Sequence, residues 1–200
     1  MAPVFLFDFG SPNAWFAHRL IPDIEARTGA RFVYRPVLLG GLFKLSGNQA
    51  PMIAFAGVPN KLAYERRETE RFVARHGLTQ FRMNPHFPVN TLMLMRAAVA
   101  AELAGLGAQY NEAMFRYMWE EPRKLDDLAV LAATMAEVGL DAEQLLTAAQ
   151  TPAVKARLAA NTQAAHDAGA FGIPSFLFGD ELYFGKERLR DVEEALTHQP

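Results

Sequence analysis

The chain of 200 residues contains no cysteine. A protein without thiols forms no disulfides, binds no metal through thiolates and performs no dithiol redox chemistry of its own. An excess of one charge is also lacking, since 20 basic and 22 acidic residues leave a net charge of −2. The basic residues form no stripe and stand beside acidic ones, as in Glu65–Glu68. This pattern is typical of solvated helix faces and offers no electrostatic basis for binding nucleic acid.

Long apolar runs are missing as well. The longest, Ala97–Leu106, is interrupted by Glu102 and is too short to cross a bilayer. The N-terminus enters apolar sequence within a few residues, without the regions that make up a secretion signal. We therefore expect a cytoplasmic protein that does not contact membranes. Hydrophobic residues make up 50% of the chain, which suits one domain, or one domain with an insertion, around a real core.

The first residues have the character of a β-α-β unit. Val4–Phe9 predicts a strand buried on both faces, and Arg31–Val37 predicts a second, parallel strand. Between them Pro12–Ala26 predicts a helix that Ser11 caps and Gly29 ends.

The C-terminal part predicts two further strands and a helix. Ser175–Phe178 is followed by the turn Gly179-Asp180, the short strand Glu181–Phe184 and a final helix. Pro174 directly precedes the first of these strands and cannot donate to the sheet. A cis bond between Ile173 and Pro174 is one explanation, and a structural proline at a sheet edge is the other. Together the two ends of the chain follow the plan of the thioredoxin fold.

The middle of the chain is helical in character. After a loop that contains Gly40, Gly41, Gly47 and Asn48, we expect helices over Lys61–His76, Val89–Leu106, Ala108–Trp119, Leu125–Val138, Ala142–Ala149 and Pro152–Ala168. Prolines and glycines predict loops with definite turns over Asn48–Asn60 and Thr79–Pro88. The sequence thus predicts an α/β protein, with a thioredoxin-like domain of residues 1–41 and 169–200 and an inserted, all-helical domain of residues 42–168.

Ser11 is the first candidate for chemistry. It follows a buried strand and opens a helix, where backbone N–H groups lack partners and the helix dipole favours negative charge. One interpretation is a cap that only satisfies the helix end. The other is a hydroxyl that donates a hydrogen bond to a bound thiolate or other anion. The histidines show no spacing typical of metal ligands, so we predict no metal site; they are His18, His76, His86, His166 and His198.

Five more polar residues are candidates for binding. Lys61 lies near a predicted helix start, where a positive charge is electrostatically unfavourable, although a solvated lysine is the simpler reading. Asn48 lies in a loop, and Asn90 follows a proline-rich turn where it could simply cap the next helix. Glu187 and Arg188 open the last helix, where Glu187 complements the dipole and the helix end could also hold a ligand.

Six blocks of residues, in order along the chain, carry a resemblance to a known family; they are Asp8-Phe9-Gly10-Ser11-Pro12, Gly47-Asn48, Pro59-Asn60-Lys61-Leu62-Ala63-Tyr64, His86-Phe87-Pro88-Val89-Asn90-Thr91, Gly172-Ile173-Pro174-Ser175-Phe176 and Gly185-Lys186-Glu187-Arg188-Leu189. Almost from end to end the chain resembles the 2-hydroxychromene-2-carboxylate isomerase family. That family groups with kappa-class glutathione transferases in the DsbA-like branch of the thioredoxin fold. The resemblance implies glutathione as cofactor.

The resemblance also implies roles for the candidates. Ser11 would be the catalytic residue that holds the glutathione sulfur as a thiolate, and Ile173, before the presumed cis-Pro174, would pair with the cysteinyl backbone. Residues implied to bind glutathione are Ser11, Asn48, Lys61, Ile173, Pro174, Glu187 and Arg188. Residues implied to contact the substrate are Lys61, Asn90 and Trp15. Two departures stand out: Glu187 replaces the usual Asp of the family, and Asn13-Ala14-Trp15 replaces a common Tyr/Phe-Ser-Tyr, so the pocket wall is reshaped.

The activity that the resemblance implies is a glutathione-dependent isomerisation. It interconverts 2-hydroxychromene-2-carboxylate and trans-o-hydroxybenzylidenepyruvate, or a related intermediate of aromatic degradation, by reversible thiolate addition. The small aromatic carboxylate would need a cation, Lys61 first and Arg188 second, and a homodimer is implied. Two alternatives stay open: a kappa-like glutathione transferase or peroxidase, and a non-catalytic module that binds peptides at the cis-proline edge. The lack of cysteine fits the first two activities, because the nucleophile would arrive with glutathione.

Overall fold

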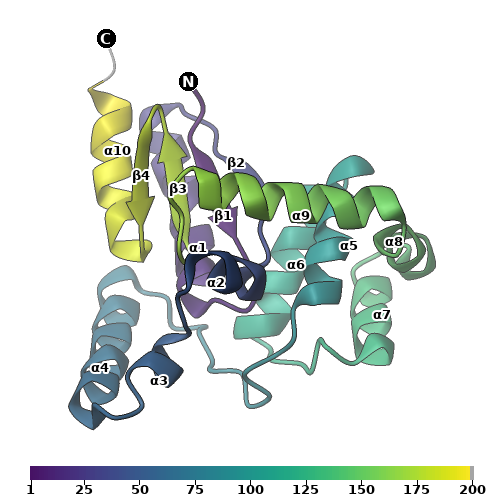
Figure 1. Cartoon of the computed structure of the whole chain (residues 1–200), viewed down its shortest axis with the longest axis horizontal. Helices are drawn as coiled ribbons and strands as arrows, with labels where there is room; N and C mark the ends of the chain where they lie inside the picture. Colours follow the sequence, from purple (N-terminus) through teal and green to yellow (C-terminus); the bar gives the residue numbers. More distant parts are fainter. Residues whose placement is uncertain (199–200) are drawn as a thin grey trace.

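The computed structural model describes residues 1–198, and its centre is a mixed sheet of four strands in the order β2-β1-β3-β4. β1 (Val4–Phe7) runs parallel to β2 (Val33–Pro36) and antiparallel to β3 (Ser175–Phe178), and β4 (Glu181–Phe184) pairs antiparallel with β3. The two ends of the chain therefore meet in one sheet, as Figure 1 shows. This confirms the thioredoxin-like α/β fold predicted from the sequence.

α1 (Pro12–Thr28) begins and ends where local chemistry requires. The Ser11 hydroxyl accepts a hydrogen bond from the Ala14 N–H at 3.2 Å, which satisfies one of the free donors of the first turn. Gly29 ends the helix with φ 73°, a left-handed conformation that costs other residues energy because of their Cβ. Both positions agree with the prediction.

Between β2 and β3 the chain forms α2 (Leu39–Ser46), α3 (Pro51–Ala54), α4 (Pro59–His76), α5 (Leu92–Leu103), α6 (Gly107–Trp119), α7 (Leu128–Glu137), α8 (Ala142–Ala149) and α9 (Pro152–Asp167). After β4, the 3₁₀ turn η1 (Lys186–Arg188) leads into α10 (Leu189–Thr197). The helices predicted from periodicity are all present, with ends that differ by a few residues.

The loop predicted around Gly40 and Gly41 is wrong, because both residues lie inside α2. Glycine is unfavourable in a helix interior, but α9 lies very close at this point. A Cβ on Gly41 would come within 3.2 Å of the Thr162 Cγ2 atom. Tertiary packing thus overrides local propensity here. The loop predicted over residues 48–60 likewise contains the short α3 and the start of α4.

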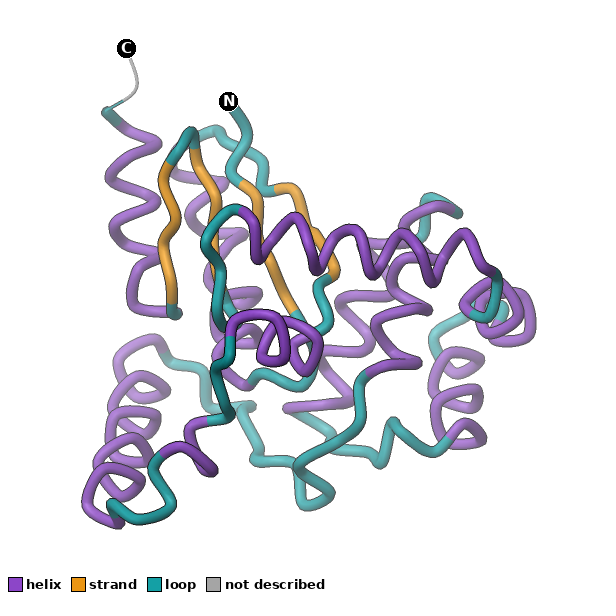
Figure 2. Tube along the Cα trace, in the orientation of Figure 1, coloured by secondary structure: helices purple, strands orange, loops and turns teal. Residues whose placement is uncertain are grey.

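The helices cover both faces of the sheet. In Figures 1 and 2, α9 and α2 lie in front of the strands and α1 lies behind them; α10 contacts α1, β3 and β4. The core is continuous between the sheet and the helices that follow β2. The ring centroid of Phe9 lies 4.8 Å from that of Phe115 of α6, and Trp119 donates its indole N–H to the Phe9 carbonyl at 2.8 Å.

Since sheet and helices share this core, the division into residues 1–41 with 169–200 and residues 42–168 stays a prediction, and residues 199–200 lie outside the described part. α4 packs loosely for its length, since Phe72 is the one buried side chain among its 18 residues. Within residues 1–198, no helix is both long and apolar enough to span a bilayer.

Candidate functional site

Two segments far apart in sequence meet at the start of α1. Ser11 is 5% exposed, and its hydroxyl donates to the Ile173 carbonyl at 3.0 Å while accepting from the Ala14 N–H. The Ile173-Pro174 bond is cis, as the sequence suggested. One hydroxyl therefore connects the helix N-terminus with the segment that leads into β3.

Two backbone donors beside this hydroxyl lack an acceptor within residues 1–198. They are the Asn13 N–H, in the first turn of α1, and the Ile173 N–H. A free amide and a hydroxyl at a helix N-terminus favour an anion. A free amide next to a strand, as at Ile173 before β3, suits the carbonyl of a bound peptide. The arrangement therefore offers donors to a ligand that combines both groups.

The buried carboxylate of Asp8 holds this turn by hydrogen bonds. Asp8 is completely buried and accepts three hydrogen bonds: from the Gly10 N–H at 2.8 Å, the Leu39 N–H at 2.7 Å and the Thr91 hydroxyl at 3.1 Å. Burial raises the pKa of Asp8 above its ordinary value, an effect larger than the opposing effect of the three donors. Asp8 thus joins the Ser11 turn to the starts of α2 and α5.

The sequence indicated Asp8 only as part of a motif. Its signal as a structural residue is a single charge within an otherwise apolar stretch, Phe5–Phe9. A buried carboxylate needs donors, and Asp8 finds one at the first residue of α2, whose N-cap Leu38 has no side-chain hydrogen bond of its own.

The cis-proline segment also contacts two other predicted regions. The Pro174 carbonyl accepts from the Gly185 N–H at 2.9 Å, so η1, with Glu187, begins beside the cis proline. Asn48 donates its side-chain amide to the Phe171 carbonyl at 2.9 Å. The structure therefore brings Asn48 and the start of η1 to the segment that Ser11 contacts.

Gly172 leaves no room for a side chain. A Cβ at this position would lie 2.7 Å from a ring atom of Phe184, whose ring packs against that of Phe171 with a tilt of 48° and centroids 4.5 Å apart. We expect Gly172→Ala to lower the melting temperature by about 2–4 °C, since displacing the ring costs about 1 kcal/mol. Thermal unfolding measures this effect. Gly40→Ala is the control, because a Cβ there meets nothing within 4 Å.

Phe184→Leu should rescue the Gly172→Ala variant in a double-mutant cycle, because it removes the ring atoms that the new methyl group meets. A Gly172→Ala protein as stable as the Gly40→Ala protein would contradict the prediction.

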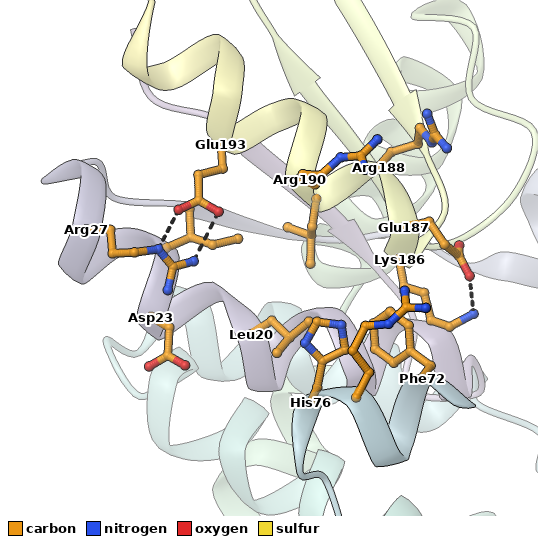
Figure 3. Close-up of a pocket in the computed structure, with 13 residues that line it drawn as sticks. Leu20, Asp23, Arg27, Phe72, His76, Lys186, Glu187, Arg188, Arg190 and Glu193 are labelled. Carbon is orange, nitrogen blue, oxygen red and sulfur yellow. Dashed lines mark hydrogen bonds and ion pairs between the residues drawn. The ribbon is translucent and has the colours of Figure 1, made fainter. Parts of the chain in front are cut away.

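A cleft of about 630 Å³ extends from η1 along α1 and the C-terminal end of α4, and Figure 3 shows its residues. Lys186, which the sequence analysis did not single out, is 7% exposed. Its ammonium pairs with Glu187 at 2.6 Å and lies 5.0 Å from the Phe72 ring centroid. Arg188 also lines the cleft and pairs with Asp191 at 2.6 Å. Glu187 and Arg188 thus lie together at the edge of a cleft that carries charges of both signs.

The remaining predicted residues are not gathered around Ser11 by direct contacts. Lys61 pairs with Glu65 at 3.2 Å and lies over the Phe55 ring at 4.8 Å. Asn90 is exposed and its side-chain oxygen accepts from the Leu92 N–H at 3.1 Å, beside the start of α5. Substrate contacts through Lys61 and Asn90 stay predictions.

The substrate contact expected of Trp15 does not fit its environment. Trp15 is completely buried, packs against Phe16 and Phe81, and donates its indole N–H to Glu120 at 3.0 Å. The face of α1 that carries Trp15 points into the core, so the side chain offers no surface to a ligand. No group of His, Asp and Glu in the described chain lies close enough to hold a metal ion.

Comparison with known proteins decides the family. The profile of the DSBA-like thioredoxin domain matches residues 4–197. The chain belongs to the DSBA-like thioredoxin domain family. Its sequence contains no cysteine, so the chain brings no thiol of its own to this fold.

Proteins similar to this chain include enzymes. A 2-hydroxychromene-2-carboxylate isomerase of Sphingobium xenophagum is 27% identical over 197 residues, and the alignment covers 96% of each chain. Glutathione S-transferase kappa 1 of Homo sapiens is 26% identical over 210 residues, covering 96% of this chain and 87% of that protein. The solved structure of a 2-hydroxychromene-2-carboxylate isomerase matches with a TM-score of 0.81 at 24% identity, covering 98% of this chain and 94% of the other. These matches confirm the family resemblance inferred from the six sequence blocks.

Proposed function

We propose that the chain is a glutathione-dependent isomerase that interconverts 2-hydroxychromene-2-carboxylate and trans-o-hydroxybenzylidenepyruvate, or a related intermediate of aromatic degradation. The observation that carries the proposal is the set of donors at the start of α1, the Ser11 hydroxyl with the free amides of Asn13 and Ile173, in a protein without cysteine. Similarity to an isomerase at 27% identity supports it.

The residues of the site fit glutathione at three points. The free Ile173 N–H suits the backbone carbonyl of a cysteinyl residue, and Ser11 with the Asn13 N–H suits a thiolate. Glu187 and Lys186 carry the opposite charges that the amine and carboxylate of a γ-glutamyl group require. When bound, glutathione supplies the thiol nucleophile that the chain lacks, and reversible addition of that thiol allows a former double bond to rotate.

Ser11 has to change its hydrogen bond to play this part. A hydroxyl donates one proton, and in this structure the Ile173 carbonyl accepts it. Donation to a thiolate instead contributes about 1.5–3 kcal/mol, and the helix dipole adds about 0.3–1 kcal/mol. Loss of the Ile173 contact offsets about 0.5–1.5 kcal/mol of this gain. The midpoints of these ranges leave a net gain of about 1.9 kcal/mol, which would lower the pKa of a bound thiol by about 1.4 units from about 8.5.

The decisive experiment compares three substrates at equal glutathione concentration: the chromene carboxylate, a halonitrobenzene and an organic hydroperoxide. We expect the largest kcat/KM for the chromene. A larger value for either of the others would favour the alternative, a kappa-like transferase or peroxidase, which the similarity to kappa 1 enzymes supports.

A thermal melt separates both enzymes from the third alternative, the non-catalytic peptide-binding module. Glutathione at about 100 times its Kd should stabilise the folded state by about 2.7 kcal/mol. A melting temperature that does not respond to glutathione would refute both glutathione-dependent functions. The roles of Lys61 and Arg188 toward the substrate carboxylate, the homodimer and the cytoplasmic location remain proposals from the sequence.

A further inference from the structure

A cavity of about 400 Å³ lies between α2, α5 and α9. α9 contacts both of the other helices, and Figure 1 shows α2 and α9 together in front of the sheet. Ser11, the cis-proline segment and the residues of the cleft beside η1 do not line this cavity. Its volume lies in the range of about 300–1,000 Å³ that is typical of small-molecule sites. The cavity is therefore a candidate for binding that is separate from the site at Ser11.

Leucine side chains form the apolar part of the lining. Leu38 immediately precedes α2 and Leu45 lies near its end, Leu92 begins α5, and Leu158 lies on α9. Leu158 is 3% exposed and Leu45 is 42% exposed, so the apolar lining continues from the core to the surface. Such a surface favours the apolar part of a ligand, because both lose contact with water on binding.

Each of the three helices also contributes one positively charged residue to the lining. Residues three or four positions apart lie on the same face of a helix, and each cation stands at this spacing from another residue that lines the cavity. The pairs are Lys44 with Gly41, Arg96 with Leu92, and Lys155 with Leu158. The cations therefore lie on the helix faces that border the cavity.

These positive charges are accessible to a ligand. Lys44 and Lys155 are exposed, and Arg96 is half-buried. Within residues 1–198 none of the three side chains makes an ion pair or a hydrogen bond, and Arg96 has no nitrogen that is both unpartnered and shut off from solvent. Its guanidinium is thus in contact with water. A partly buried cation without a counter-charge is unfavourable, and a bound anion would compensate for the lost solvation.

The other groups of the lining do not compete with an anion. The lining contains no Asp or Glu, unlike the cleft beside η1. The Thr162 hydroxyl donates to the Leu158 carbonyl at 2.8 Å and accepts from the Leu38 N–H at 3.1 Å. Gln163 donates its amide to Asp167 at 2.7 Å. The chemistry of a ligand is therefore selected by the leucines and by three positive charges, which favour an anion by charge complementarity.

We propose that this cavity binds a small amphipathic carboxylate, an aliphatic chain that ends in one negative charge. The chain lies on the leucines, and the carboxylate pairs with Arg96 and with the exposed Lys44 and Lys155. A guanidinium binds a carboxylate through two parallel N–H bonds, and the flexible stems of the lysines allow their ammonium groups to approach the same charge. No residue of the lining belongs to the site at Ser11, so the test does not depend on the isomerase activity.

The probes are octanoate, 1-octanol and acetate, which separate the contributions of chain and charge. In calorimetry with the full-length protein we expect octanoate to bind at least tenfold more tightly than 1-octanol, which lacks the charge, and than acetate, which lacks the chain. Absence of octanoate binding at millimolar concentration would overturn the proposal. An equal affinity for 1-octanol or for acetate would overturn it as well, because the cations or the leucines would then select nothing.

Substitutions to methionine remove each charge but keep an apolar side chain. Arg96→Met should lower the affinity for octanoate at least tenfold without lowering the melting temperature, since its guanidinium has no partner to lose. Lys155→Met should lower the affinity about threefold, as expected of a more exposed ion pair.

Arg157→Met is the matched control for Lys155→Met. Arg157 is also exposed on α9, but it is two residues away, on a different face, and does not line the cavity. We expect this variant to bind octanoate as the wild type does. Unchanged affinity in Arg96→Met and Lys155→Met would refute the proposal. An equal loss in Arg157→Met would also refute it, because octanoate would then respond only to the overall surface charge.

Discussion

Ser11→Ala is expected to lower glutathione-dependent turnover by about 10- to 150-fold. The estimate corresponds to losing a charge-assisted hydrogen bond of about 1.5–3 kcal/mol from the hydroxyl to a thiolate. The pKa of the bound thiol should rise in parallel, because the thiolate loses the hydrogen bond that stabilises it relative to the neutral thiol. Steady-state kinetics and the ultraviolet absorbance of the thiolate as a function of pH measure the two effects.

The chain supplies a matched control for the structural part of the Ser11 substitution. Thr151 caps α9 as Ser11 caps α1: each is followed by proline, and each accepts from the N–H three residues on. Thr151→Ala should cost about 1 kcal/mol of stability, as the lost cap at Ser11 does, but leave the thiol pKa unchanged. If Ser11→Ala behaves like Thr151→Ala in both kinetics and thiol titration, Ser11 is only a cap.

Asp8→Ala should destabilise the protein by about 3–5 kcal/mol, a large part of the stability of a typical domain. The substitution leaves the donors of Gly10, Leu39 and Thr91 buried without their acceptor, and each unsatisfied group costs about 1–3 kcal/mol. Denaturant unfolding measures the loss. Asp127→Ala is the control, since that carboxylate also accepts backbone N–H groups, but at an exposed helix start. A loss no larger than that of Asp127→Ala would contradict the role of Asp8.

The pH dependence of Asp8→Asn gives a second test. Burial raises the pKa of Asp8 in the folded state above the 3.8 of the unfolded chain. The folded state then binds a proton at Asp8 more readily than the unfolded state does. This difference contributes its full amount to the free energy of unfolding below pH 3.8, and the contribution is lost as the pH rises through the folded-state pKa. The advantage of the wild type over Asp8→Asn should therefore be larger at acid than at neutral pH. A constant difference would show that the pKa of Asp8 is unshifted.

Most of the fold was predictable because its signals are local. Proline at the first helical position, a hydroxyl cap and a closing glycine placed α1 correctly, and turn residues separated β3 from β4. The error at α2 has a different origin. Gly40 and Gly41 indicate a loop by propensity, but packing against Thr162 on α9 makes this a helix that needs a small residue. A partner over 100 residues away leaves no trace in the local pattern.

The candidate site was predictable to a similar degree. Ser11, Ile173 and Pro174 meet as expected, because β1 leads into the Ser11 turn, the cis-proline segment leads into β3, and antiparallel pairing of β1 with β3 brings the two segments together. Trp15 could not be placed from sequence, because buried and pocket-lining aromatic residues have the same helical spacing. The burial of Lys186 was not predicted from the sequence either, because a lysine beside a glutamate normally lies in solvent.

By itself the sequence determined that any thiol chemistry must use an imported sulfur, and where the first helix begins and ends. These properties depend on residue type and on neighbours within a few positions. Only the tertiary structure decided that the Ser11 proton goes to a carbonyl 162 positions away and that Asp8 joins three segments. Each of these depends on how distant parts of the chain pack around one core, which local propensity does not encode.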